Sequence, residues 1–176
     1  MKRLSVAMAG VLALVFLSAP SARAEKPTRK GAAFTVNPIG HVKKTDGRTL
    51  IVLDEKFQPG LLGLEGFSHF YMLWWFDKND TPQKRSVLQV HPMGRRDNPL
   101  TGVFATRSPV RPNLIALTFC KLVSVKENVI EIERTDAFDG TPVLDIKPFI
   151  PGYDSSPDAK LPDWLTRARK QRKASR

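Results

Sequence analysis

The chain has 176 residues and a formal net charge of +11, and this length suits one domain with a hydrophobic core of its own. The charge is unevenly spread, because residues 160–176 alone carry +6 whereas residues 25–159 carry only +2. The high net charge therefore does not indicate a broad nucleic-acid-binding face over the body of the chain. Cys120 is the single cysteine, which excludes an internal disulfide and a cysteine-based metal site. Its apolar neighbours predict a small core residue.

Residues 1–24 have the form of a secretory signal peptide. A short basic start is followed by an apolar run, residues 4–17, and by Ala22-Arg23-Ala24. The apolar run is shorter than the roughly 20 residues that a membrane-spanning helix needs. We therefore predict cleavage after Ala24 and a secreted or periplasmic protein, in preference to an uncleaved membrane anchor. Residues 25–33 are expected to form a flexible lead-in.

After residue 33 the sequence has the pattern of short β-strands. Thr45-Asp46-Gly47 is a turn signal between the first two of them. Residues 67–76 are apolar on both alternating faces, which is typical of a strand covered on both sides. The expected strands cover residues 34–42, 48–54, 67–76, 86–91, 102–106, 114–125, 129–135 and 141–149. We predict an all-β fold, a single closed or nearly closed β-barrel of about seven strands, because closure removes hydrophobic strand edges.

The C-terminal segment, residues 152–176, is predicted to be a basic tail that contains a short helix over residues 162–173. Pro162 suits the first helical position, and Trp164 and Leu165 follow it as apolar anchors. Two interpretations of the charges stay open. The tail either contacts an anionic surface, nucleic acid or lipid, or is a solvated end of the chain.

No hydrolase or nucleotide-binding motif occurs in the sequence. G-x-S-x-G, the Walker loop and G-x-G-x-x-G after a strand are all absent. The three histidines, His41, His69 and His91, lie on different expected elements without the spacing of metal ligands. We interpret them as structural and predict no metal site.

Polar residues gather where two expected strands end. The first cluster comprises Arg107, Ser108, Pro109, Arg111 and Asn113, and the second comprises Asp136, Asp139, Gly140, Thr141 and Asp145. One interpretation is a binding pocket. The alternative is a structural rim, in which Asp139-Gly140 only shapes a turn and Arg111 pairs with carboxylates such as Asp139.

Three long motifs occur along the chain in this order: GLLGLEGFSHFYMLWWF, HPMGRRDNPLTGVFATRSPVRPN and DGTPVLDIKPFIP. Together they resemble the TsaA-like (UPF0066) family, whose members include the TrmO-type tRNA methyltransferases. The resemblance covers roughly residues 34–151 and implies a single-barrel domain there. It also implies a homodimer that binds S-adenosylmethionine near its interface. The implied reaction is methyl transfer to the N6 side of a modified adenine next to the tRNA anticodon.

The same resemblance implies which residues hold the cofactor. These are Arg107, Leu117, Asp136, Ala137, Phe138, Asp139, Asp77 and Lys78. The residues that would shape the pocket are Ser108, Pro109, Arg111, Asn113, Gly140 and Thr141. An arginine suits the cofactor carboxylate, while carboxylates suit its hydroxyl, amino or sulfonium groups. No catalytic base is implied, because methyl transfer mostly requires positioning in a dry site.

The chain departs from the family pattern in three places. Leu114 and Ala116 stand where relatives usually have Pro and Gly, and Asp77-Lys78 stands where His and a polar residue are expected. Only residues 43–47 connect the first two strands, so a loop that helps hold the cofactor in the family is missing. Two hypotheses follow. The chain is a family methyltransferase, on another substrate or retained in the cytoplasm, or it is an exported non-catalytic binding or structural module.

Overall fold

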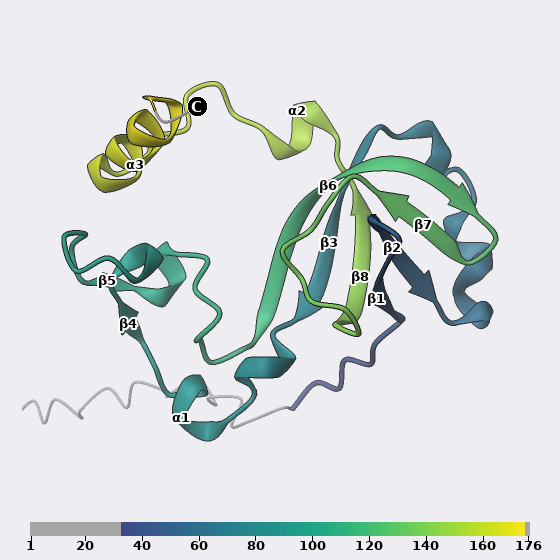
Figure 1. The fold of residues 1–176 in the computed structure, drawn as a ribbon, viewed down its shortest axis with the longest axis horizontal. Helices are drawn as coiled ribbons and strands as arrows, with labels where there is room; N and C mark the ends of the chain where they lie inside the picture. The colour runs from purple at the N-terminus through teal and green to yellow at the C-terminus, as the bar shows by residue number, and fades with distance from the viewer. Residues whose placement is uncertain (1–32, 175–176) are drawn as a thin grey trace, which may run out of the picture. The chain divides into compact units, whose positions relative to one another are not determined.

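The computed structural model describes residues 33–174, so the predicted signal peptide and its cleavage site after Ala24 lie outside the described residues. Six strands close into an antiparallel barrel in the order β1-β2-β7-β6-β3-β8 (Figure 1). They are β1 (Gly40–Thr45), β2 (Arg48–Leu53), β3 (His69–Trp75), β6 (Ile115–Lys126), β7 (Val129–Ile132) and β8 (Pro142–Pro148). The predicted closed all-β barrel is confirmed, with six strands where about seven were expected.

Alternate residues of the strands fill the barrel interior. On β3 the side chains of Phe70, Met72 and Trp74 are buried, while the residues between them are only half-buried. The other strands contribute Val42, Ile51, Leu53, Ala116, Cys120, Ile130, Ile132 and Val143 to the same core. The two-residue period of a strand decides which side chains face inward. The predicted core position of Cys120 is confirmed.

β1 and β2 form a hairpin with a two-residue turn at Asp46-Gly47. Both residues have positive φ, 49° and 75°, as a type I′ hairpin turn requires, so the predicted turn is confirmed. The first strand begins at Gly40 and not at residue 34. Phe34 and Val36, which the prediction placed in this strand, are instead largely exposed.

Residues 76–114 leave the barrel between β3 and β6, and we call them the excursion. They contain η3 (Asp77–Asn79), α1 (Pro82–Arg85), β4 (Gln89–Val90), η4 (Pro92–Gly94), β5 (Thr101–Gly102) and η5 (Val103–Ala105). β4 and β5 pair only with each other. The prediction that residues 86–91 and 102–106 are full strands is therefore wrong. The prolines at 92, 99, 109 and 112 lack the N–H that a longer ladder needs.

Two short 3-10 segments, η1 (Glu55–Leu61) and η2 (Leu64–Gly66), join β2 to β3. After β8 the chain forms α2 (Pro151–Asp154) and α3 (Asp163–Ala174), which confirms the predicted C-terminal helix. The carbonyl of Pro162 accepts the N–H groups of Leu165 and Thr166 at 3.0 and 3.1 Å, which starts α3. Within residues 33–174 no helix has the length and apolar character of a membrane span.

Candidate functional site

One end of the barrel, where β3 ends and β6 and β8 begin, carries the second predicted cluster except Asp145, which lies further along β8 and lines another pocket. The strand register sets Trp74 opposite Ala116 of β6 and also opposite Val143 of β8. The segment that connects β7 to β8 ends at Thr141, two residues before Val143, and its Thr141 carbonyl accepts the N–H of Val42 of β1. We call this end the barrel mouth; its residues are Trp74, Leu117, Thr118, Asp136, Ala137, Phe138 and Thr141.

A chain of side-chain hydrogen bonds holds Asp136 at the barrel mouth. The Trp74 indole N–H donates to Thr118 Oγ1 at 2.9 Å, and the Thr118 hydroxyl donates to Asp136 Oδ1 at 3.3 Å. Asp136 is itself exposed, so its carboxylate can still accept a bond from a ligand. The sequence interpretation missed Trp74 and Thr118 as partners of Asp136. Their inward positions on two adjacent expected strands were the available signal.

Asp139 is bound to the backbone of the neighbouring strand. Its Oδ1 accepts the N–H of Lys44 at 2.7 Å. Gly140, with φ of 77°, donates its N–H to the carbonyl of Val42 at 2.8 Å. Asp139-Gly140 therefore shapes the turn that begins β8, which is one of the two interpretations that the sequence left open.

The other predicted residues of the barrel mouth differ in accessibility. Ala137 is fully buried, and Thr141 is buried with a hydroxyl that has no hydrogen-bond partner among residues 33–174. Phe138 and Leu117 are 63% and 41% exposed. The mouth thus offers one oriented carboxylate and the accessible ring of Phe138, a combination that suits a ligand with both polar and flat apolar parts. Leu117 lies on the outer face of β6, because the side chains of neighbouring strand residues point to opposite faces and Thr118 points inward.

Asp77 and Lys78 lie directly after β3, at the start of η3. They pair with each other, with Lys78 Nζ 3.2 Å from Asp77 Oδ2. The N–H of Phe76 donates to the Leu114 carbonyl at 2.8 Å, which ties this turn to the start of β6. Leu114 and Ala116, two departures from the family pattern, are both buried. The barrel therefore accommodates them in its packing.

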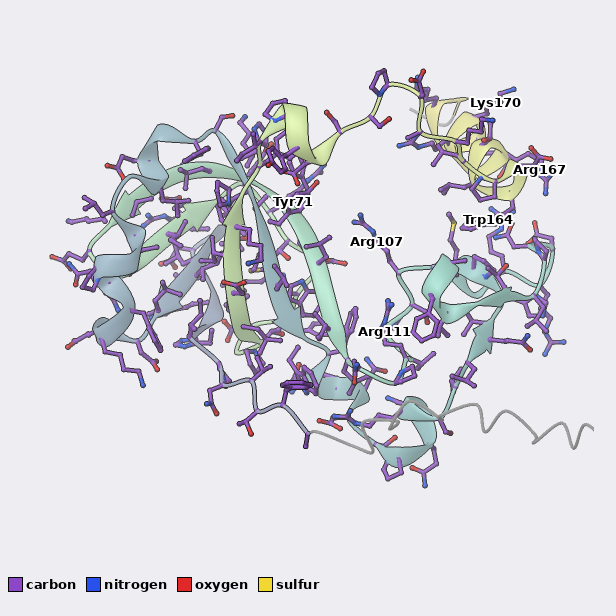
Figure 2. The ribbon with its side chains drawn as sticks, turned by 180° about the vertical axis from the view of Figure 1, so that it is seen from behind. Tyr71, Arg107, Arg111, Trp164, Arg167 and Lys170 are labelled. Atoms are coloured by element: carbon purple, nitrogen blue, oxygen red, sulfur yellow. The ribbon has the colours of Figure 1, made fainter. Side chains whose placement is uncertain are left out.

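The first predicted cluster lies on the excursion. Arg107, Ser108 and Pro109 line a pocket of about 1020 Å³, together with Val90, His91, Pro92, Met93, Gly94, Phe104, Ala105, Thr106, Leu161, Trp164 and Leu165. Arg107 and Asn113 are exposed, and Figure 2 shows Arg107 extending outward from its loop. Within the part of the chain that the structure describes, the Arg107 guanidinium has no hydrogen bond or ion pair. It is an available cation.

Arg111 and Ser108 stabilise the loop that carries Arg107. One guanidinium N–H of Arg111 donates to the Thr106 carbonyl at 3.5 Å. Thr106 Oγ1 accepts the N–H of Ser108 at 3.2 Å, and Ser108 Oγ accepts the N–H of Val110 at 3.4 Å. These are local bonds between side chains and backbone. The suggested pairing of Arg111 with carboxylates such as Asp139 is wrong, because Arg111 braces its own loop.

Two histidines have structural contacts, in agreement with the sequence interpretation. The Nδ1–H of His91 donates to the Asn98 carbonyl at 2.8 Å, and the Asn98 amide donates to the Pro92 carbonyl at 2.9 Å. These bonds close the turn between β4 and β5. His69 stacks on Phe119 of β6, with ring centroids 4.9 Å apart.

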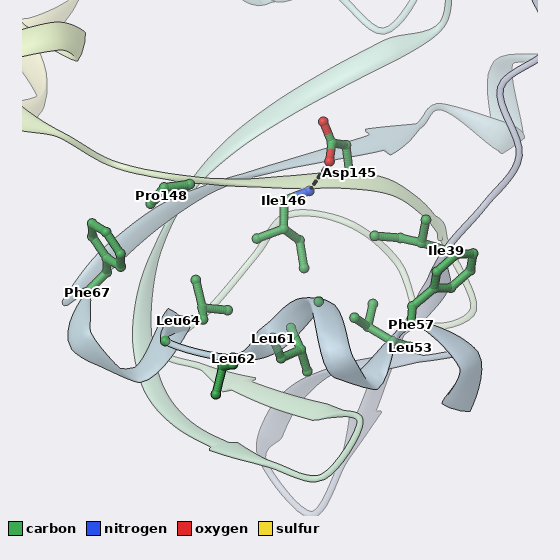
Figure 3. Close-up of a pocket in the computed structure, with 12 residues that line it drawn as sticks. Ile39, Leu53, Phe57, Leu61, Leu62, Leu64, Phe67, Asp145, Ile146 and Pro148 are labelled. Carbon is green, nitrogen blue, oxygen red and sulfur yellow. Dashed lines mark hydrogen bonds between the residues drawn. The ribbon is translucent and has the colours of Figure 1, made fainter.

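A second pocket of about 490 Å³ lies against η1 and η2 and is lined mainly by apolar side chains, among them Ile39, Leu53 and Leu61 (Figure 3). Its carboxylate, Asp145, accepts the N–H of Ile146 at 2.9 Å and pairs with Lys147 at 2.8 Å. None of the predicted cofactor-binding residues lines it. The barrel mouth and the Arg107 pocket therefore form the candidate site.

Comparison with known proteins connects this geometry to a family. Residues 34–155 match the family model described as tRNA-methyltransferase O N-terminal domain. The chain is 43% identical, over 116 residues, to a probable S-adenosyl-L-methionine-binding protein of Methanocaldococcus jannaschii, covering 66% of this chain and 92% of the relative. It is 47% identical, over 98 residues, to the tRNA (adenine(37)-N6)-methyltransferase of Mus musculus, covering 56% of this chain and 22% of the relative.

A solved structure shares the fold. The crystal structure of TrmO from Pseudomonas aeruginosa matches with a TM-score of 0.60 and 28% sequence identity. The match covers 77% of this chain and 63% of the TrmO chain. The chain thus spans less than two thirds of the solved relative and about a fifth of the mouse enzyme.

Proposed function

The chain belongs to the family of the tRNA-methyltransferase O N-terminal domain, and we propose that it is a methyltransferase that uses S-adenosylmethionine and acts on an adenine amino group in tRNA. The observation that carries the proposal is the oriented, exposed carboxylate of Asp136 with the accessible ring of Phe138 two residues further along the chain. The archaeal relative named for cofactor binding and the mouse relative named for the reaction support it.

The residues present fit the chemistry of this cofactor. The Asp136 carboxylate, held by Thr118, suits hydroxyl or amino groups, and the exposed Phe138 ring offers apolar surface for an adenine ring. Leu117, on the outer face of β6, would contribute to the site at a subunit interface. Arg107 suits the cofactor carboxylate, because a guanidinium forms paired hydrogen bonds with a carboxylate. When bound, S-adenosylmethionine supplies an activated methyl group. The chain's own contribution is to position the reactants and to exclude water.

We further propose a homodimer in which the two groups of site residues come from different protomers. Among the described residues, no hydrogen bond or ion pair joins the Arg107 loop to Asp136. The outer face of β6 also exposes an apolar side chain at every second position except 121: Ile115, Leu117, Phe119 and Val123 are 41–55% exposed. An apolar strip of this kind is a surface that a partner subunit can cover.

Methyl transfer from labelled S-adenosylmethionine to unmodified tRNA tests the function. The wild-type chain should label tRNA, and mass spectrometry of the nucleosides should locate the methyl group on an adenine N6. Asp136→Asn should lower the rate at least about tenfold, because a neutral amide replaces a charged acceptor. Asp158→Asn, in the exposed loop before α3, is the matched control and should keep the rate. If the wild-type chain transfers no label to the tRNA, the proposal is contradicted.

Mixed protomers test the dimer. Arg107→Ala and Asp136→Asn should each be nearly inactive alone. If each site takes Arg107 from one protomer and Asp136 from the other, a mixed dimer has one intact site. An equal mixture should then recover about a quarter of the wild-type activity. A mixture as inactive as its components shows that both residues act within one protomer.

The compartment is a separate proposal. We propose that residues 1–24 are an export signal that is cleaved after Ala24, and that tRNA is methylated by chains that have not left the cytoplasm. Mass spectrometry of the N-terminus in each cell fraction tests this: chains outside the cytoplasm should begin at Glu25. Chains that begin at Met1 and occur only in the cytoplasm would contradict export. The alternative of an exported non-catalytic module has no support from the relatives described above.

A further inference from the structure

α3 has two chemically different faces. Trp164, Leu165 and Ala168 are half-buried, and their spacing puts them on one side of the helix. The described basic side chains of the helix, Arg167, Arg169, Lys170 and Lys173, are exposed. Figure 2 shows Trp164 on the side of α3 that faces the excursion, with Lys170 on another side.

The apolar face of α3 is anchored on the excursion. Trp164 and Leu165 line the same pocket as Phe104 and Arg107. Two turns further along the helix, the Arg95 guanidinium donates to Gln171 Oε1 at 3.4 Å. The helix is therefore tied to the excursion by this hydrogen bond, and its half-buried Trp164 and Leu165 face the shared pocket. Its described basic side chains are exposed.

Electrostatics agree with this docking. The pKa of the Asp97 carboxyl is lowered, first by the hydrogen bond from Arg95 and to a smaller extent by the charge of Arg167. α3 thus lies within range of the turn between β4 and β5. None of the four described basic side chains of α3, Arg167, Arg169, Lys170 and Lys173, forms an ion pair with another described residue. The exposed side chains of Arg167, Arg169, Lys170 and Lys173 therefore form a cationic surface, on which Arg167 lies within electrostatic range of Asp97.

The arrangement favours a nucleic acid over a membrane as the anionic partner. An amphipathic helix binds a membrane by inserting its apolar face into the lipid, and in α3 Trp164 and Leu165 on that face are half-buried and line a pocket on the excursion instead of facing solvent. A phosphate backbone requires only accessible cations.

We propose that the basic face of α3 docks the phosphate backbone of the RNA acceptor, with Trp164 and Leu165 fixing the helix in place. The identity of the acceptor rests on the proposed function. The family match ends at residue 155, so this surface lies outside the matched domain.

Fluorescence anisotropy with a labelled, unmodified tRNA transcript tests the charges, with the full chain. The variant R167Q/K170Q/K173Q should bind the transcript at least about tenfold more weakly at roughly 0.1 M salt. The slope of log affinity against log salt concentration should become less negative by about 2–3, as expected for three lost phosphate contacts. The control K43Q/K56Q/K126Q removes the same charge from exposed positions on the barrel and η1 and should bind like the wild type. Equal losses in both variants, or no loss in either, would overturn the proposal.

A second variant separates a docked helix from a free basic tail. Trp164→Ala keeps every charge but removes the anchor, so it should also weaken tRNA binding several-fold. Wild-type affinity in Trp164→Ala would overturn the docked arrangement. Co-sedimentation with vesicles of phosphatidylglycerol and phosphatidylcholine should show weaker retention than tRNA binding. Strong retention that Trp164→Ala abolishes would assign the face to lipid and overturn the proposal.

Cofactor binding keeps this inference distinct from the proposed function. R167Q/K170Q/K173Q should bind S-adenosylmethionine like the wild type, because its substitutions lie on the outer face of α3. tRNA binding that depends on α3 in a chain that binds no cofactor would support this inference and sink the proposed function. If the chain binds the cofactor but its tRNA affinity does not depend on α3, the proposed function is supported and this inference is overturned.

Discussion

At Gly40 the first strand of the barrel approaches the second so closely that no side chain fits. A Cβ atom at this position would overlap the Val52 carbonyl oxygen. Gly40→Ala should therefore lower the free energy of unfolding by roughly 1–3 kcal/mol, because the hairpin backbone must shift. Gly60→Ala is the matched control, since a Cβ there meets no atom within 4 Å, and it should change stability by less than about 0.5 kcal/mol. Urea unfolding measures both, and a Gly40→Ala curve that overlays the wild type would refute the close approach.

The buried thiol of Cys120 should make the stability of the protein depend on pH. Burial in the barrel raises the pKa of its thiol to about 12. In the unfolded chain the thiol ionises near pH 8.5, so rising pH favours unfolding between these two values. The stability of the wild type should fall more steeply from pH 8 to about pH 10 than that of Cys120→Ala. Urea midpoints at both pH values measure this, and parallel curves would contradict a buried, protonated thiol.

At the scale of elements, Asp80 and Arg85 together join the start of the excursion to the last residue of β3 and to the end of the excursion. Asp80 accepts two bonds from Arg85, at 2.7 and 3.2 Å, and one from the Trp75 indole at 3.1 Å. Arg85 also donates to the Pro112 carbonyl at 3.0 Å and lies 5.2 Å from the centroid of the Trp75 ring. This brace orients the segment that carries Arg107.

Asp80→Asn should loosen the excursion and leave the barrel folded. Limited proteolysis should cut faster within residues 76–114 of this variant, while the urea midpoint of the barrel stays unchanged. The pKa of Asp80 is lowered, first by the hydrogen bond from Arg85. The stabilisation is therefore present above the ordinary carboxyl pKa of about 4 and is lost as pH falls through the folded-state pKa. Cleavage of the wild type should rise in acid, and that of Asp80→Asn should not. Equal cleavage of the two at neutral pH would contradict the brace.

The strands of the barrel could be predicted because their side chains alternate. Expected strands over residues 67–76 and 114–125 match β3 and β6 to within two residues at each end. The excursion could not be predicted in the same way, since its apolar residues also alternate locally while its prolines prevent long ladders. The strand expected at residues 102–106 is instead the 3-10 turn η5 after Gly102.

The site could be predicted in part. The sequence shows Asp136 in the connection between two strands, β7 and β8. It also singles out Arg107, although the strand expected before Arg107 is a 3-10 turn. The bonds from Trp74 through Thr118 to Asp136 depend on the register between β3 and β6, and sequence spacing does not give that register. The position of Arg107 in a pocket shared with Trp164 depends on a contact between segments far apart in the chain.

At the scale of the whole molecule, two parts of the chain divide the chemistry that the proposals assign. The body, residues 25–159, has nearly balanced charges with a net charge of only +2 and contains the barrel mouth, so its net charge attracts a polyanion only weakly. The C-terminal segment carries +6 and can attract a polyanion over a longer range. Salt should therefore weaken the binding of RNA much more than the binding of the cofactor.

Calorimetric titration of the full chain with S-adenosylmethionine tests most directly whether the barrel mouth and the Arg107 loop form a cofactor site. We predict saturable binding of one cofactor per chain. Affinity should fall at least about tenfold in Arg107→Ala, which removes the charged partner of the cofactor carboxylate, and should be kept in Lys126→Ala on the far part of β6. A folded wild-type chain that gives no binding heat at about millimolar cofactor would contradict the account.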